Sequence, residues 1–99
     1  MLYALIGNDM ANSPERRTAA HAGHLARLAA MTNEGRLVLA GPFPALDAEN
    51  PGEGGFTGSL VVAEFSDLAA AQQWAAADPY VLEGVYASWE VRPFQPVSP

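Results

Sequence analysis

The chain has 99 residues, of which 49% are hydrophobic and 16% charged, whereas an average soluble protein carries roughly 25% charged residues. This composition excludes intrinsic disorder, which needs few apolar residues and much charge, and the length predicts one domain. The net charge of −6, with Arg as the only strongly basic residue type, argues against binding to nucleic acid or to an anionic membrane surface.

The absence of cysteine excludes disulfides, thiolate catalysis and Cys-based metal sites. No stretch approaches the ~18 apolar residues of a membrane helix. The apolar start Met1–Ile6 lacks the basic residues and the cleavage site of a signal peptide. We therefore expect a soluble, cytoplasmic protein.

The first third of the chain predicts a strand and a long helix. Leu2–Asn8 is apolar and ends in turn residues, as a buried strand does. Ser13 as N-cap and Pro14 at the first helical position start a helix that should run to about Glu34 and stop at Gly35. Helical spacing predicts an inward face made of Thr18, Leu25, Leu28, Ala29 and Thr32.

Two strands and a long loop are expected next. Arg36–Phe43 and Ser59–Phe65 are predicted strands, and Ala45–Thr57, rich in Gly, Pro and acidic residues, is a loop. Gly54 to Ser59 has the glycines of a phosphate-binding loop. It leads into a strand and lacks Lys, however, so a hairpin loop is the better interpretation. The loop's acidic residues lack the spacing of a calcium site.

A second helix and a last strand complete the chain. Ser66 is expected to cap a helix from Asp67 to about Ala77. Asp78-Pro79 ends it, because the residue before proline avoids the helical region. A short turn or a single helical turn over Tyr80–Gly84 leads into the strand Val85–Phe94. The helix should turn inward Leu68, Ala71, Trp74 and Ala75.

This order, βαββαβ, predicts an α+β, ferredoxin-like domain over residues 1–94, followed by a tail over residues 95–99. Right-handed crossovers would place both helices on one face of a four-stranded antiparallel sheet. A solvated sheet face alternates apolar with polar residues, but Leu37–Ala40 and Leu60–Ala63 are apolar throughout. We therefore expect the open face to pack on a second copy in a homodimer.

His21 and His24, the only histidines, share one stripe of the first helix with Arg17 and Leu28. Three interpretations stay open for them. They are solvated residues at the edge of the core, or one imidazole lines a cleft and titrates near neutrality, or they belong to a metal site. A metal site needs further ligands, and the helix offers no carboxylate there.

Asp78 has two interpretations. Asp before Pro commonly opens a turn. A carboxylate at a helix C-terminus opposes the helix dipole, however, and a histidine partner on the neighbouring helix would explain it. Ser59 suits a hydrogen-bonding role at a pocket rim better than a nucleophilic one. The aromatic residues are interpreted as core or interface residues: Trp74, Tyr80, Tyr86 and Trp89.

Several short blocks, in order along the chain, carry a family resemblance. They are Met1–Ala4, Gly23–Leu28, Glu34–Leu37, Ala40–Ala45, Gly55–Leu60, Ala63–Phe65, Ala76–Val81 and Gly84–Tyr86. They resemble the YciI-like (YCII-related) family, and their shared order makes the resemblance specific. It implies a dimeric α+β barrel of ferredoxin-like subunits.

The resemblance also implies an active site centred on a histidine and an aspartate, which by position are His24 and Asp78, with Ser59 as a neighbour. One relative dehydrochlorinates a chlorinated hydroxymuconate, and the superfamily includes muconolactone isomerases. The family often has Arg-Pro-Ala before its histidine, where this chain has His21-Ala22-Gly23. A neutral imidazole would hold an anion less well than a guanidinium there.

We therefore expect a cofactor-independent isomerase or lyase acting on a small unsaturated or keto acid. His24 would be the general acid or base, and Asp78 would orient its ring and stabilise the imidazolium. Ser59 would hydrogen-bond the pair or the ligand, and Arg17 or His21 would meet an anionic group. The alternatives are a module that binds a small ligand without turning it over and a purely structural dimer. Haem binding occurs in distant barrel relatives, but no residue here singles out a haem pocket.

Overall fold

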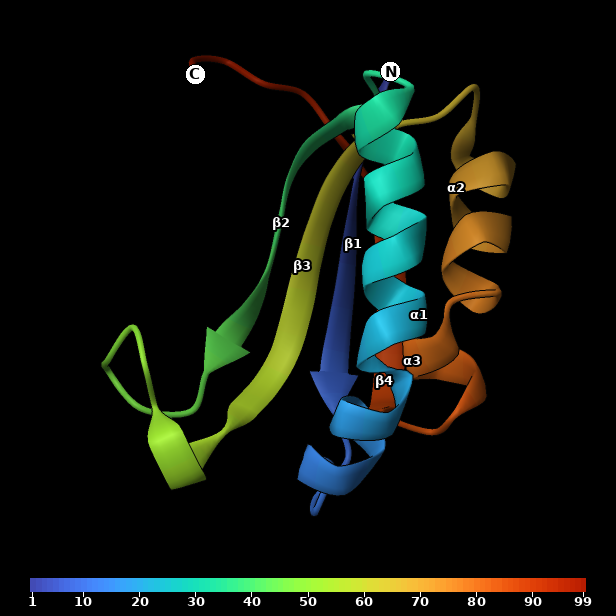
Figure 1. Ribbon diagram of the computed structural model, residues 1–99. Coiled ribbons are helices and arrows are strands. Elements are labelled where there is room, and N and C mark those ends of the chain that lie inside the picture. Colours follow the sequence, from blue (N-terminus) through green and yellow to red (C-terminus); the bar gives the residue numbers. More distant parts are fainter.

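The computed structural model describes all residues from 1 to 99. Its elements are β1 (Leu2–Asp9), α1 (Pro14–Asn33), β2 (Leu37–Pro44), the 3-10 turn η1 (Gly52–Gly54), β3 (Phe56–Glu64), α2 (Leu68–Ala76), α3 (Pro79–Leu82) and β4 (Tyr86–Phe94). The four strands form one antiparallel sheet in the order β2-β3-β1-β4. Figure 1 shows the long helix α1 running along this sheet with α2 beside it. The predicted α+β, ferredoxin-like fold is confirmed.

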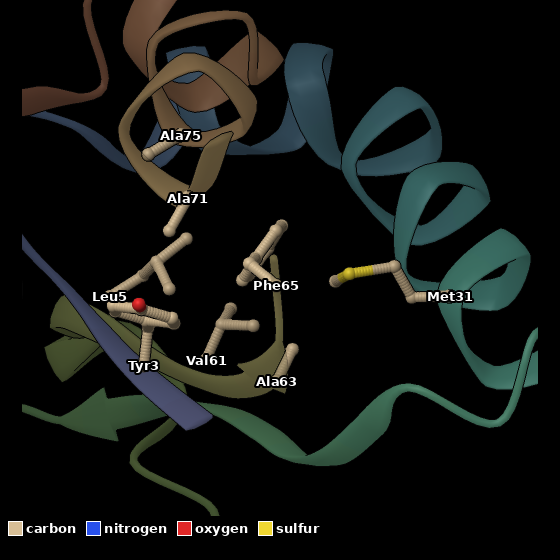
Figure 2. Close-up of a cluster of buried hydrophobic side chains, with 8 residues drawn as sticks. All are labelled: Tyr3, Leu5, Met31, Val61, Ala63, Phe65, Ala71 and Ala75. Atoms are coloured by element: carbon tan, nitrogen blue, oxygen red, sulfur yellow. The ribbon is translucent and has the colours of Figure 1, made fainter. Parts of the chain in front are cut away.

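The hydrophobic core lies between the helices and one face of the sheet. Alternate residues of the central strands point into it, because successive side chains of a strand face opposite sides. Figure 2 shows this cluster, in which strand side chains meet Met31 of α1 and the small residues of α2. Its members are Tyr3, Leu5, Met31, Val61, Ala63, Phe65, Ala71 and Ala75. Leu68 was expected to face inward as well, but it is 37% exposed.

Helix α1 begins at Pro14 and is followed by Gly35 in the left-handed region, at φ 72°, as predicted. The prediction of its inward face was wrong. Only Leu28 is half-buried there, and the other four predicted residues are exposed: Thr18, Leu25, Ala29 and Thr32. The residues that are buried are Ala20, His24 and Met31. Hydrophobic periodicity counts histidine as a polar residue and therefore predicts that His24 faces solvent. Here a buried carboxylate binds the imidazole and offsets the cost of burying it.

Both predicted helix caps differ in detail. Ser13 occupies the N-cap position of α1, but its hydroxyl donates to Asp9 Oδ2 at 2.8 Å and caps no helical N–H. The cap of α2 is Asp67 rather than Ser66, and its Oδ1 accepts from the N–H of Ala70 at 2.8 Å. A carboxylate at this position also interacts favourably with the positive end of the helix dipole.

The sheet face away from the helices carries a shallow apolar hollow. Leu60 and Val62 of β3 line it, together with Val38 and Leu39 of β2, which are 57% and 51% exposed. Residues 96, 98 and 99 of the C-terminal tail border the same hollow, and Figure 1 shows the tail leading away from β4 toward the β2 side of the sheet. None of the helices has both the length and the apolar character needed to cross a bilayer.

Candidate functional site

A hydrogen-bonded histidine–aspartate pair lies between the sheet and the helices. His24 projects from the middle of α1, and its Nδ1 lies 3.0 Å from Oδ1 and 2.9 Å from Oδ2 of Asp78. The two side chains are 9% and 5% exposed. The expected conflict of Asp78 with a helix dipole was wrong. Asp78 is the N-cap of α3, and its carboxylate accepts from the N–H of Tyr80 at 2.9 Å, which is a favourable position.

Asp78 is held by a third group, the guanidinium of Arg27. Nη1 of Arg27 donates to Oδ2 at 3.0 Å, and its Nη2 donates to the carbonyl of Trp74 at 2.8 Å. Burial raises the pKa of Asp78, but the hydrogen bonds from His24 and the Tyr80 N–H, with the charges of His24 and Arg27, outweigh it, and the net pKa is lowered. The carboxylate is therefore ionised at neutral pH.

This ionisation determines which nitrogen of the neutral imidazole carries its proton. An ionised carboxylate only accepts hydrogen bonds, so Nδ1 of His24 must be the N–H that donates to Asp78. Nε2 makes no hydrogen bond within the protein. No buried side-chain nitrogen or oxygen lacks a partner, so Nε2 lies where solvent reaches it. Its lone pair is therefore free to accept a proton from a ligand.

Tyr80 connects the two histidines. It is 1% exposed, and its ring stacks on that of His24 with 4.1 Å between the ring centres and 15° between the planes. Its hydroxyl lies 3.0 Å from Nδ1 of His21. Burial raises the pKa of Tyr80, so the phenol stays protonated at neutral pH and His21 has a neutral partner.

Arg17 belongs to a second polar network. Its Nε donates to Oδ2 of Asp9 at 2.8 Å, and its Nη2 donates to Ser59 Oγ at 2.7 Å and to the carbonyl of Gly58 at 2.9 Å. Burial lowers the pKa of Arg17, but the hydrogen bond and charge of Asp9 outweigh it and raise the pKa. Arg17 is therefore mainly a buried structural cation.

Two hollows adjoin these groups. The first, called the His24 hollow here, is lined by His24 and Asp78 together with Tyr86, Trp74 and Trp89, among others. Its volume of about 20 Å³ accommodates one water molecule. The second, called the Arg17 groove, is lined by Arg17, His21, Phe56 and Tyr80, among others, and has a volume of about 530 Å³. That lies within the roughly 300–1,000 Å³ of small-molecule pockets.

The structure thus brings the five predicted site residues into two sets, and the Tyr80 ring lies between His24 of one set and Arg17 of the other. His24 and Asp78 form one, and Arg17 and Ser59 form the other; His21 lies at the groove and joins the first set through Tyr80. No group of three or more His, Cys, Asp or Glu side chains has the arrangement of a metal site.

Sequence reasoning missed four residues of the site: Asp9, Arg27, Tyr80 and Tyr86. Arg27 follows His24 by three positions, the spacing of neighbours on a helix face, so helix geometry could have found it. Asp9 and Tyr86 carried no local signal, because their partners lie on other elements.

Comparison with known proteins identifies relatives of this chain. The YCII-related domain model matches residues 1–95. "Protein YciI" of Escherichia coli is 54% identical over 97 residues, which cover 98% of this chain and 99% of that protein. An uncharacterized protein of Haemophilus influenzae is 53% identical over 97 residues, with the same coverage.

A solved structure resembles the fold as well. 5-Chloro-2-hydroxyhydroquinone dehydrochlorinase from Burkholderia phenoliruptrix, in complex with 2,5-dihydroxybenzoquinone, superimposes with a TM-score of 0.84. The two sequences are 22% identical, and the match covers 96% of this chain and 94% of the other. At that identity the likeness shows the fold.

Proposed function

The chain belongs to the YCII-related family, and we propose that it is a small enzyme in which His24 and Asp78 perform acid–base chemistry on a small unsaturated or keto acid. The observation that carries this proposal is the state of the imidazole. Nδ1–H of His24 donates to the carboxylate of Asp78, and the lone pair of Nε2 is left without a partner from the protein at the His24 hollow.

In the proposed reaction, Nε2 of His24 removes a proton from a carbon next to a carbonyl group. The imidazolium that forms is stabilised by the ionised carboxylate of Asp78, which already binds its Nδ1–H. In an isomerisation, the imidazolium returns the proton to another carbon of the delocalised anion. In an elimination, the anion expels a leaving group instead, and His24 loses its proton to water.

The elimination variant has one support outside this chain. The similar fold cited above belongs to a dehydrochlorinase, which was crystallised with a quinone. This makes chlorinated hydroxyquinols and related enolisable rings reasonable candidates to test beside muconate-type acids.

The size of the His24 hollow constrains how a ligand binds. At about 20 Å³ it does not admit a ring. Trp89 lines it from β4 and is 37% exposed, so its side chain can turn outward without leaving the hydrophobic core. We propose that the ligand displaces the Trp89 side chain when it binds beside His24.

A homodimer through the open sheet face is part of the proposal. Val38 and Leu39 expose about half of their side chains there, beside Leu60 and Val62. Exposed apolar clusters of this kind commonly mark sites of association. A second copy would cover them and account for strands that are apolar on both faces.

Kinetic comparison of variants tests the enzyme. Chlorinated hydroxyquinols and muconate-type acids should be converted by the native protein, and His24→Ala and Asp78→Asn should lose at least about a hundredfold in kcat/KM. Thr32→Ala, on the exposed side of α1, is the matched control and should keep full activity. Equal turnover in all four proteins would refute the proposal.

A non-catalytic binding module is the second candidate, and the Arg17 groove favours it. The groove is ligand-sized and carries Arg17 and His21, while the His24 hollow is water-sized. Binding of the same acids, measured by calorimetry, would be reduced by His21→Ala and left intact by His24→Ala if this candidate is correct. The enzyme proposal requires the His24 variant to lose turnover.

A further inference from the structure

We propose that Tyr86 is the hydrogen-bond donor that stabilises the oxyanion formed when His24 removes a proton. This inference rests on the proposed acid–base function and deepens it. It requires a substrate whose acidic hydrogen is next to an oxygen that becomes negatively charged.

The backbone places Tyr86 at the site by an irregularity of the sheet. Where β1 pairs with β4, the register shifts between Asn8, which pairs with Ser88, and Asp9, which pairs with Tyr86. Such bulges redirect a side chain and are frequent beside active sites. The Tyr86 ring consequently lines the same hollow as His24 and Asp78.

Gly7 makes room for this ring. A Cβ atom at Gly7 would lie 2.4 Å from two atoms of the Tyr86 ring, which is far inside van der Waals contact. Tyr80 also packs on this ring in a T-shaped arrangement, with 5.6 Å between centres and 79° between planes. The phenol of Tyr86 is therefore held in one position, as a donor that must be preorganised requires.

A polar network lies beside the phenol of Tyr86. Arg17 Nη2 has only protons to offer, so Ser59 Oγ accepts from it at 2.7 Å. Ser59 and the charge of Arg17 both act to lower the pKa of Tyr86 against the effect of burial. The phenol therefore lies at the meeting point of this network and the His24 hollow.

The protonation state agrees with this role. Burial raises the pKa of Tyr86 to about 12, although its hydrogen bond with Ser59 and the charge of Arg17 act in the opposite direction. The phenol is thus a neutral donor throughout the physiological range. Tyr80 does not compete for the role, because its hydroxyl is bound to His21 and its ring is stacked on His24.

The step balances without a further reactant. Nε2 of His24 takes a proton from carbon, and the electron pair of the broken C–H bond forms a C=C bond while the carbonyl π electrons move to oxygen. That oxygen accepts the hydrogen bond of Tyr86 while the charge persists. The electron pair on oxygen then re-forms the C=O bond. The electrons of the C=C bond either take the proton back from the imidazolium or expel a leaving group.

Binding of phenolates tests Tyr86 without any turnover. 4-Nitrophenol and phenol are the probes, because an anionic oxygen on a flat ring imitates the proposed oxyanion, and the colour of 4-nitrophenol reports its ionisation. We expect the native protein to bind 4-nitrophenolate and Tyr86→Phe to bind it about 10- to 100-fold more weakly, the loss that removing a donor to a charged group causes.

Tyr86→Phe preserves the ring on Gly7, so the variant should fold. A matched variant, Tyr3→Phe, changes a phenol at the far end of the core and should bind the probe like the native protein. Equal binding by Tyr86→Phe and the native protein, or no binding by the native protein, overturns the inference. Loss of binding in Tyr86→Phe together with unchanged turnover in His24→Ala would support the donor and refute the acid–base role of His24, so the two proposals fail separately.

Discussion

The ring of Tyr80 stacks on the imidazole of His24 with 4.1 Å between centres, while the main-chain N–H of Tyr80 donates to the carboxylate that binds that imidazole. One residue thus restrains both members of the pair. The stack restricts rotation of the imidazole, and the N–H bond holds the carboxylate as the cap of α3. Since the hydroxyl of Tyr80 also binds His21, substitutions of Tyr80 should change the surroundings of both histidines.

Two substitutions of Tyr80 should separate its roles. Tyr80→Phe keeps the stacked ring and loses the bond to His21, so we expect it to cost about 1 kcal/mol of unfolding free energy. Tyr80→Ala also removes the buried ring and should cost about 3–5 kcal/mol. Denaturant unfolding measures both values. Equal losses in the two variants would contradict a structural role of the ring.

The tautomer of His24 is predicted by the ionised state of Asp78. In the native protein near neutral pH, the neutral imidazole should carry its proton on Nδ1, whereas free histidine prefers the other nitrogen. Asp78→Ala removes the acceptor and should abolish this preference. Long-range proton–nitrogen NMR spectra distinguish the two forms, with exposed His21 as the internal comparison. Observation of the Nε2–H form in the native protein would contradict the proposed base.

Asp78 should make the free energy of unfolding depend on pH in the acid range. Its pKa in the folded protein lies below the ordinary value of 3.8, so its contribution is fully present above about that pH. The contribution is lost as the pH falls further, through the lower folded pKa. Unfolding free energies from neutral pH down through this range should fall more steeply for the native protein than for Asp78→Asn. Parallel curves for the two proteins would show that the carboxylate is not stabilised in the fold.

Gly7→Ala should displace the Tyr86 ring, because the new methyl group would overlap it. We expect a loss of about 1–3 kcal/mol of unfolding free energy. The pKa of Tyr86, about 12 in the native protein, should fall toward 10 as the phenol becomes exposed, and tyrosinate absorbance measures that change. Gly41→Ala is the matched control, because nothing lies within 4 Å of its Cβ position. A Gly7 variant as stable as the control, with unchanged absorbance titration, would contradict the packing described.

The raised pKa of Tyr86 also predicts that the protein loses stability at alkaline pH. A group whose pKa rises on folding stabilises the protein below its unfolded value, near 10. That contribution is lost as the pH increases toward about 12. Tyr86→Phe should therefore reduce the alkaline loss of stability, as measured by unfolding across this range. An alkaline loss of stability in Tyr86→Phe as large as in the native protein would contradict this prediction.

Charge on the open sheet face should prevent self-association. Leu39→Glu places a carboxylate among Val38, Leu60 and Val62, and we expect it to give monomers or aggregates where the native protein sediments as a dimer. Leu25→Glu adds the same charge at an exposed position on α1, where Leu25 is 48% exposed, and should leave the dimer intact. A native protein that sediments as a monomer would contradict the proposed interface.

Local sequence determined the elements and their order. Pro14 and Gly35 mark the ends of α1 because their backbone preferences act within a few residues, and Asp78-Pro79 ends one helix for the same reason. The βαββαβ order then leaves few topologies for the sheet. The family resemblance predicted His24 and Asp78 as a pair. The argument that Asp78 opposes the dipole of the preceding helix was wrong, because Asp78 caps the helix that follows.

Only the tertiary structure decided which polar groups are buried together. The inward face of α1 carries His24 and Arg17 rather than Leu25, because carboxylates from α3 and β1 offset the cost of desolvating them. His24 and Asp78 are 54 positions apart, and Arg17 and Ser59 are 42, so no local pattern encodes their contact. The apolar excess of the sequence predicted a buried core and an uncovered sheet face, but the site is made by polar contacts between elements that meet only after folding.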